Sequence, residues 1–131
     1  MANTFTSVQY KEGMGDNPAS VRRSTGELFL NHSLFFNMPF ESRIWILLHE
    51  LAHLKRDTAN EHIADEQAFE WYVSRGYSLR RGVLALTKIM NNCNAEHRQR
   101  AKNQLIRCLR YDWEHNHYQP AFEYFKKLNA L

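Results

Sequence analysis

The chain has little of what marks secreted, disulfide-bonded or membrane-spanning proteins. It contains 2 cysteines in 131 residues and no C-x-x-C pair, so we interpret Cys93 and Cys108 as free thiols in a reducing compartment. The longest apolar run, from Ile44 to Leu48, is far too short to cross a bilayer. No basic segment followed by an apolar one, as in a secretory signal, opens the sequence. We therefore expect a soluble, cytoplasmic protein.

The composition is that of one globular domain. Hydrophobic residues make up 44% and aromatic residues 13% of the chain, and there are no internal repeats or low-complexity segments. A chain of this length can bury a real core, so we expect a single domain over residues 1–131. The net charge of +3 is uneven, since residues 1–74 carry 6 basic and 10 acidic side chains and residues 75–131 carry 11 and 4. The basic residues are dispersed, which favours a solvated helical surface over a nucleic-acid partner.

The segment from Arg43 to Leu54 is almost wholly apolar, but two histidines and a glutamate interrupt it. Apolar residues all around such a segment predict a buried helix. A spacing of four places His49 and His53 one turn apart on one face, where both imidazoles can reach one metal ion. Glu50 is then placed beside the metal, to hold a metal-bound water and take its proton. The alternative is two core histidines with Glu50 in an ion pair, because an unpaired carboxylate there would cost several kcal/mol.

A zinc peptidase site needs three protein ligands and leaves a fourth position for water. Glu61 is the nearest well-placed carboxylate, reached after a turn that folds the next helix back toward the metal helix. Asp65, one turn later, is placed to hydrogen-bond the free N–H of a ligand histidine and so to fix its orientation. Asp57, His62 and Asp65 itself are alternative third ligands.

The other elements predicted from the sequence are short strands and amphipathic helices. We expect the strands at 4–11 and 27–31 to pair with each other, and residues 12–18 to form a loop. The metal helix is expected to begin at 38–41 and to end at 55–56. Further helices are expected at 61–75, 78–90 and 95–113 and from Pro120 onward. The predicted fold class is α+β, with a small antiparallel sheet packed on a mainly helical body around the buried H-E-x-x-H helix.

The two informative segments also resemble a known family. Residues 61–68 fit the pattern E-x-x-A-D-x-x-A, which accompanies H-E-x-x-H in gluzincin metallopeptidases. Over about residues 26–90 the sequence is most similar to the CAAX prenyl protease and heat-shock membrane peptidase group and to its small soluble relatives, the minigluzincins. It departs from them in the seven residues between His53 and Glu61, fewer than usual, and in lacking the membrane spans of the larger members.

This resemblance implies a zincin-like fold and a zinc metalloendopeptidase that acts on a protein or peptide inside the cell. His49, His53 and Glu61 would bind zinc, Glu50 would be the general base, and Asp65 would orient a histidine. Residues 27–31 would form an edge strand that binds the peptide in extended form, by β-augmentation.

In such an enzyme the zinc lowers the pKa of its bound water toward ~7, while Glu50 moves the proton to the leaving amine. Two other hypotheses are a catalytically inactive, zinc-stabilised protein-binding module of the same fold and a nucleic-acid-binding protein that uses the basic helix at 98–110. The donor that would stabilise the oxyanion is left open among His97, Tyr72, Tyr77, Tyr111 and the arginines of residues 98–110.

Overall fold

The computed structural model describes residues 2–84 and 94–115 of the chain. Backbone contacts divide the chain into two compact units, Met1–Ser78 and Leu79–Leu131. The elements described in the first unit are β1 (Ser7–Tyr10), β2 (Ala19–Arg22), β3 (Glu27–Leu30), α1 (His32–Phe36), α2 (Phe40–Lys55) and α3 (Glu61–Ser74). Those described in the second are a π-helical turn, η1 (Arg80–Leu84), and helix α5 (Ala95–Glu114). The fold class is α+β, as predicted.

The three strands form one mixed sheet in the order β1–β3–β2. β2 is antiparallel to β3, whereas β1 is parallel to it, with Val8 opposite Leu28. The predicted pairing of the first strand with residues 27–31 is therefore confirmed, but the prediction of a purely antiparallel sheet is wrong. The reason is the extra strand β2, which forms the hairpin with β3 and leaves β1 to pair along the opposite edge.

The turn between β2 and β3 depends on Gly26. The N–H groups of Thr25 and Gly26 both approach the carbonyl of Arg22, at 3.3 and 2.8 Å. Gly26 has φ +81°, and a Cβ atom there would lie 2.4 Å from the carbonyl oxygen of Thr4. Only glycine combines this left-handed backbone with such a close approach of the N-terminal segment.

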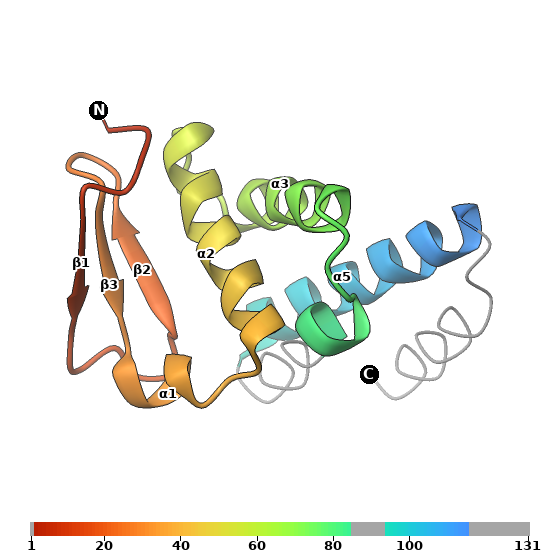
Figure 1. Ribbon diagram of the computed structural model, residues 1–131, viewed down its shortest axis with the longest axis horizontal. Helices are drawn as coiled ribbons and strands as arrows, with labels where there is room; N and C mark the ends of the chain where they lie inside the picture. Colours follow the sequence, from red (N-terminus) through yellow and green to blue (C-terminus); the bar gives the residue numbers. More distant parts are fainter. Residues whose placement is uncertain (1, 85–93, 116–131) are drawn as a thin grey trace. The chain divides into compact units, whose positions relative to one another are not determined.

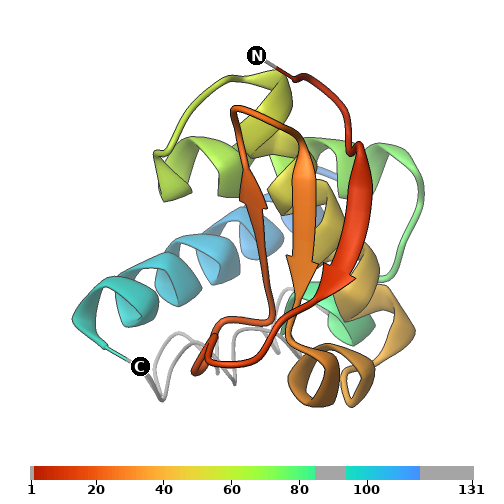
Figure 2. The same cartoon turned by 90° about the vertical axis from the view of Figure 1, so that its left-hand side faces the viewer.

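One face of the sheet forms the core together with α2. Leu28 and Leu30 lie on this face because they are two residues apart on β3, and Ala19 joins them because it is opposite Leu30. All three are buried. Figures 1 and 2 show α2 lying across the sheet, and α2 also contacts α3 extensively. With Trp45 and Ile46 buried as well, the prediction that residues 43–54 form an enclosed helix is confirmed.

β3 is the middle strand of the sheet, which overturns one expectation for residues 27–31. Its neighbours β1 and β2 pair with both of its edges, so an added peptide strand cannot pair there. The edge-strand role that the resemblance implied for these residues is therefore wrong. Within the described part of the chain, β1 and β2 are the edge strands of the sheet. β2 packs against α2 (Figure 1).

α2 ends in a left-handed turn. The N–H of Asp57 bonds the carbonyl of Leu54, and the N–H of Thr58 bonds the carbonyl of His53, both at 3.1 Å. These two bonds define a Schellman motif, whose left-handed residue is usually glycine but is here Asp57, with φ 46°. The Asp57 carboxylate also lies 3.2 Å from Nη1 of Arg23, beside the β2–β3 turn. The chain therefore turns sharply and starts α3 a few residues later.

α3 begins as the sequence predicts. The side chain of Asn60 accepts hydrogen bonds from the N–H groups of His62 and Ile63, at 2.9 and 3.1 Å, which makes it the N-cap. The helix ends at Ser74, close to the predicted boundary, and Gly76 follows with φ +75°. The boundaries predicted for α2 are confirmed as well, since it begins at Phe40 and ends at Lys55.

The second unit is described only in part. In α5, Ala101, Leu105 and Cys108 are buried, and Arg100 is buried as well, at 7% exposure. Of the helix predicted at 78–90, residues 80–84 form the π-helical turn and residues 78–79 are not helical. Residues 85–90 lie outside the described residues, as does the helix predicted from Pro120. None of the helices in residues 2–84 and 94–115 combines the length and apolarity that crossing a membrane requires.

Candidate metal centre

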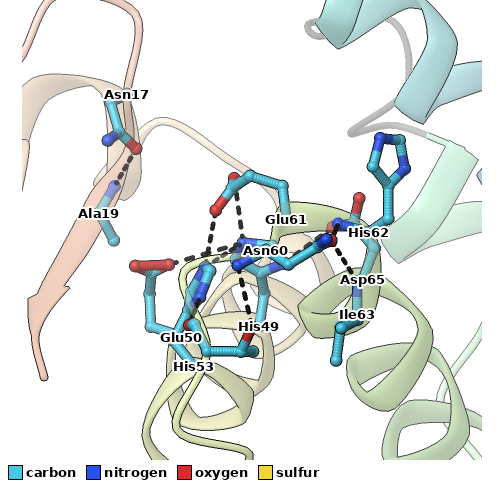
Figure 3. Close-up of polar contacts among 11 residues, drawn as sticks. Asn17, Ala19, His49, Glu50, His53, Asn60, Glu61, His62, Ile63 and Asp65 are labelled. Atoms are coloured by element: carbon cyan, nitrogen blue, oxygen red, sulfur yellow. Dashed lines mark hydrogen bonds and ion pairs between the residues drawn. The ribbon is translucent and has the colours of Figure 1, made fainter.

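The second half of α2 carries the buried residues of the candidate site. His49, Glu50 and His53 are 6%, 6% and 7% exposed, and one ligand atom from each lies within 4.8 Å of the others. The helical spacing of four brings the two histidines onto the same face, as predicted. Figure 3 shows their side chains together below Glu61, which comes from the first turn of α3. This group can hold a metal ion.

Three donor atoms converge at the centre. Nε2 of His49 and Nε2 of His53 are 3.2 Å apart. The Glu61 carboxylate places Oε1 2.7 Å from Nε2 of His53 and Oε2 3.5 Å from Nε2 of His49. Ligands bound tetrahedrally at about 2.0–2.1 Å lie about 3.3 Å from one another. The two imidazole nitrogens and the oxygens of the Glu61 carboxylate are therefore spaced much as the ligands of one small cation would be.

The opposite nitrogen of each imidazole is held by a different group. Nδ1 of His53 donates to the carbonyl oxygen of Thr58, at 2.7 Å. Nδ1 of His49 lies 2.8 Å from Oδ1 of Asp65, which is 1% exposed, but the ring N–H does not point straight at that oxygen. In the neutral form, these partners keep the proton on Nδ1 and turn the Nε2 lone pair toward the centre.

This arrangement calls for a cation. With both rings neutral and protonated on Nδ1, two nitrogen lone pairs and a carboxylate face one another within 3.5 Å, and none of the three donates a hydrogen. Either a proton or a metal ion must lie among them to offset the repulsion. Two imidazoles with one carboxylate are a common donor set for divalent transition metals. The residues present therefore fit a metal ion.

The pKa values of His49 and His53 are both raised, which also favours a positive charge at the centre. Burial lowers the pKa of His49, but the contacts with Asp65 and Glu61 and the charge of Glu50 outweigh it and raise this pKa to about 9. Burial also lowers the pKa of His53, and the carboxylate of Glu61 and the carbonyl of Thr58 raise it overall. Without a metal, a proton therefore occupies the centre near neutral pH.

The metal-free protein is expected to lose stability as the pH rises. The folded-state pKa of His49, about 9, lies above its ordinary value of 6.5. Its contribution is therefore fully present below pH 6.5 and is lost as the pH rises through about 9. Because one pKa unit corresponds to about 1.4 kcal/mol, the loss should be on the order of a few kcal/mol.

Urea unfolding of chelator-treated protein at about pH 6 and about pH 9.5 measures this difference. The His49→Asn variant is the control, and its stability should change much less over this range. A parent protein that is equally stable at both values would contradict the assignment.

Glu50 lies slightly farther from Nε2 of His49 than Glu61 does, although its carboxylate also belongs to the buried group that can hold a metal ion. Its Oε2 is 3.8 Å from Nε2 of His49, and the side chain is 7% exposed. Figure 3 shows its carboxylate directed toward the centre from below the Glu61 side chain. A carboxylate in this position can accept a proton from a water held at the centre.

The alternative third ligands lie elsewhere. Asp57 is exposed and contacts Arg23, and His62 is exposed with its ring directed away from the centre in Figure 3. Asp65 contacts Nδ1 of His49, the nitrogen that faces away from the centre. Glu61 is therefore the candidate whose carboxylate approaches both Nε2 atoms.

Of the candidate oxyanion donors, Tyr72 and Tyr77 belong to the same unit as the centre, and they contact each other there. The hydroxyl of Tyr72 donates to the carbonyl of Ser78, and the ring of Tyr77 packs against that of Tyr72. His97, Tyr111 and the arginines of α5 belong to the second unit.

Sequence reasoning missed two groups that hold the histidines. The carbonyl of Thr58 results from the turn geometry after α2, which no side-chain pattern reveals. Trp45 stacks on the imidazole of His49, with ring centroids 5.3 Å apart and an angle of 24° between the planes. A signal for Trp45 was present, because it precedes His49 by four residues and so lies on the same helix face.

The resemblance to gluzincins depends on two short motifs. Comparisons with protein-family models, with curated proteins and with solved structures find no match for the chain.

Proposed function

We propose that the protein is a zinc-dependent metallopeptidase of zincin-like fold, related to the gluzincins, that hydrolyses peptide bonds in a protein or peptide substrate. One observation carries the proposal. Nε2 of His49, Nε2 of His53 and the Glu61 carboxylate converge within 3.5 Å, with Glu50 beside them. This combines a three-donor metal site with a general base, which a purely structural site does not need.

Zinc is the metal that these donors favour, since it takes imidazole and carboxylate ligands in a tetrahedral arrangement. His49, His53 and Glu61 would hold it and leave one position open. Bound there, zinc supplies a Lewis acid and makes a water molecule acidic near neutral pH. Asp65 and the carbonyl of Thr58 would keep the two imidazoles in the orientation that binding requires.

The proton transfers of peptide hydrolysis would fall to Glu50. Its carboxylate would take a proton from the attacking water and deliver it to the nitrogen of the leaving amine. Burial favours this role, because few water molecules compete for the carboxylate at 7% exposure. The partial exposure of Glu61, at 34%, leaves the centre open to solvent on the side of α3.

We further propose that an extended peptide substrate pairs with β2, which is an edge strand among the described residues. The bond from the N–H of Asn31 to the carbonyl of Pro18 marks a hydrogen-bonded pair of the β2–β3 ladder. Because such pairs alternate in an antiparallel ladder, the backbone groups of Ala19 and Val21 point away from β3. The side chain of Asn17 accepts from the N–H of Ala19, at 3.3 Å, and Figure 3 places both residues beside the centre. β2 therefore replaces β3 as the proposed substrate strand.

Metal analysis combined with a cleavage assay tests the proposal. Elemental mass spectrometry of the purified protein should find about one zinc per chain. The protein should cleave members of a fluorogenic peptide library, lose that activity to a chelator and regain it when zinc is added. Absence of zinc after reconstitution, or cleavage that a chelator does not affect, would refute the proposal. Stoichiometric zinc without any cleavage would instead support a zinc-stabilised binding module.

A further inference from the structure

Trp45 covers one face of a candidate metal ligand. Its indole ring stacks on the imidazole of His49 one turn later on α2, at 5.3 Å between centroids and 24° between planes. Trp45 is 2% exposed and His49 6%, so the stack is closed to solvent. The imidazole of His53 contacts the imidazole of His49 edge-on, with ring centroids 4.8 Å apart and an angle of 88° between the planes. His49 is thus held by ring contacts as well as by carboxylates.

The face contact supplies an orientation that the carboxylate contact alone does not. Nδ1 of His49 lies close to Oδ1 of Asp65, but its N–H is not aimed straight at the oxygen. Because hydrogen bonds weaken steeply once they are strongly bent, this contact alone holds the orientation of the ring only loosely. A flat indole packed against the imidazole restricts this rotation and keeps Nε2 directed at the centre.

The hydrogen bonding of Trp45 indicates that its aromatic ring, and not its indole N–H, acts on His49. Nε1 is buried, and it has no hydrogen-bond partner among residues 2–84 and 94–115. A buried N–H without an acceptor lowers the stability of the fold. Phenylalanine would fill much of the same space without that cost. Tryptophan, however, presents the aromatic face that attracts a positive charge most strongly.

We propose that Trp45 is a positioning residue of the metal centre, which orients the His49 imidazole and stabilises the positive charge that this ring acquires when Nε2 binds a metal ion. The inference rests on the metal site of the proposed function and not on its peptidase activity. It predicts that zinc affinity and metal-free stability respond differently to a change at Trp45. A role in packing alone would lower both together.

Zinc affinity, measured on the full chain by competition with a chromogenic chelator, tests the inference. Trp45→Leu should weaken zinc binding about tenfold and Trp45→Phe about two- to fivefold, in line with the strength of a desolvated cation–π contact. The urea midpoint of metal-free Trp45→Phe should equal or exceed that of the parent. Trp71→Phe, on α3, is the matched control and should leave zinc affinity unchanged.

A second readout follows the geometry of the centre directly. Cobalt(II) bound in place of zinc has visible absorption bands that change with the arrangement of its ligands. Trp45→Leu should alter these bands, and Trp71→Phe should not. Unchanged zinc affinity and cobalt spectra in both Trp45 variants would overturn the inference and leave the proposed function intact. A zinc affinity that falls only in step with metal-free stability would also overturn it, and a parent that binds no zinc would overturn both proposals.

Discussion

Glu50→Gln is expected to keep the bound zinc and to lose peptide hydrolysis. The substitution preserves the size of the side chain but removes its capacity to accept a proton. Positioned general acid–base groups typically contribute about 10²–10⁴-fold to a rate, so kcat should fall within or beyond that range. Zinc content should stay near the parent value, because Glu50 lies outside the three converging donor atoms.

Glu41→Gln provides the matched control for this variant. Glu41 is also a glutamate on α2, but it lies in the first turn, two turns before His49. The control should retain both zinc and activity. If the parent cleaves nothing and Glu50→Gln behaves identically in every assay, the enzyme hypothesis fails. Loss of zinc in Glu50→Gln would instead show that Glu50 is a metal ligand and not the general base.

Glu61→Ala is expected to release most of the zinc. It removes the carboxylate oxygens that come nearest to the two Nε2 atoms in the described residues, at 2.7 Å from His53 and 3.5 Å from His49. Changes in the groups that orient metal ligands typically weaken binding by about 10–100-fold, and loss of a ligand itself should cost more than that. Elemental mass spectrometry after dialysis against a weak chelator measures the loss.

Glu66→Ala is the control, since Glu66 lies on the same helix but is exposed. It should bind zinc like the parent. Full retention of zinc in Glu61→Ala would move the third ligand to Asp57, Asp65 or His62. Of these, Asp65 would then require the His49 ring to turn around, because it now faces Nδ1.

The helices that carry the site could be predicted well because their signals are local. Pro39 precedes the start of α2, the side chain of Asn60 caps α3, and Gly76 takes the left-handed conformation just after α3 ends. The spacing of His49 and His53 predicts both imidazoles on one face. Of the groups that contact them, the sequence predicts Glu50, Glu61 and Asp65 but not Trp45 or Thr58. Periodicity and capping depend on residues a few positions apart, which the sequence displays directly.

The sheet could be predicted only in part, because its pairing depends on distant residues. β2, with the sequence Ala-Ser-Val-Arg, has a single β-branched residue and no clear alternation, so it does not stand out as a strand. Once it is missed, nothing local indicates that β1 must run parallel to β3, or that β3 lies in the middle. The prediction that residues 27–31 form an edge strand is wrong for this reason, although these residues do form a strand.

The short connection between α2 and α3 has a consequence for how the centre assembles. Every side chain assigned to it, from Trp45 to Asp65, lies within one helical hairpin, closed by the Schellman turn at Asp57 and the cap at Asn60. Contacts of such small sequence separation carry a low loop-closure entropy and form early in folding. Assembly of the metal ligands therefore does not have to wait for the slow, long-range pairing of β1 with β3.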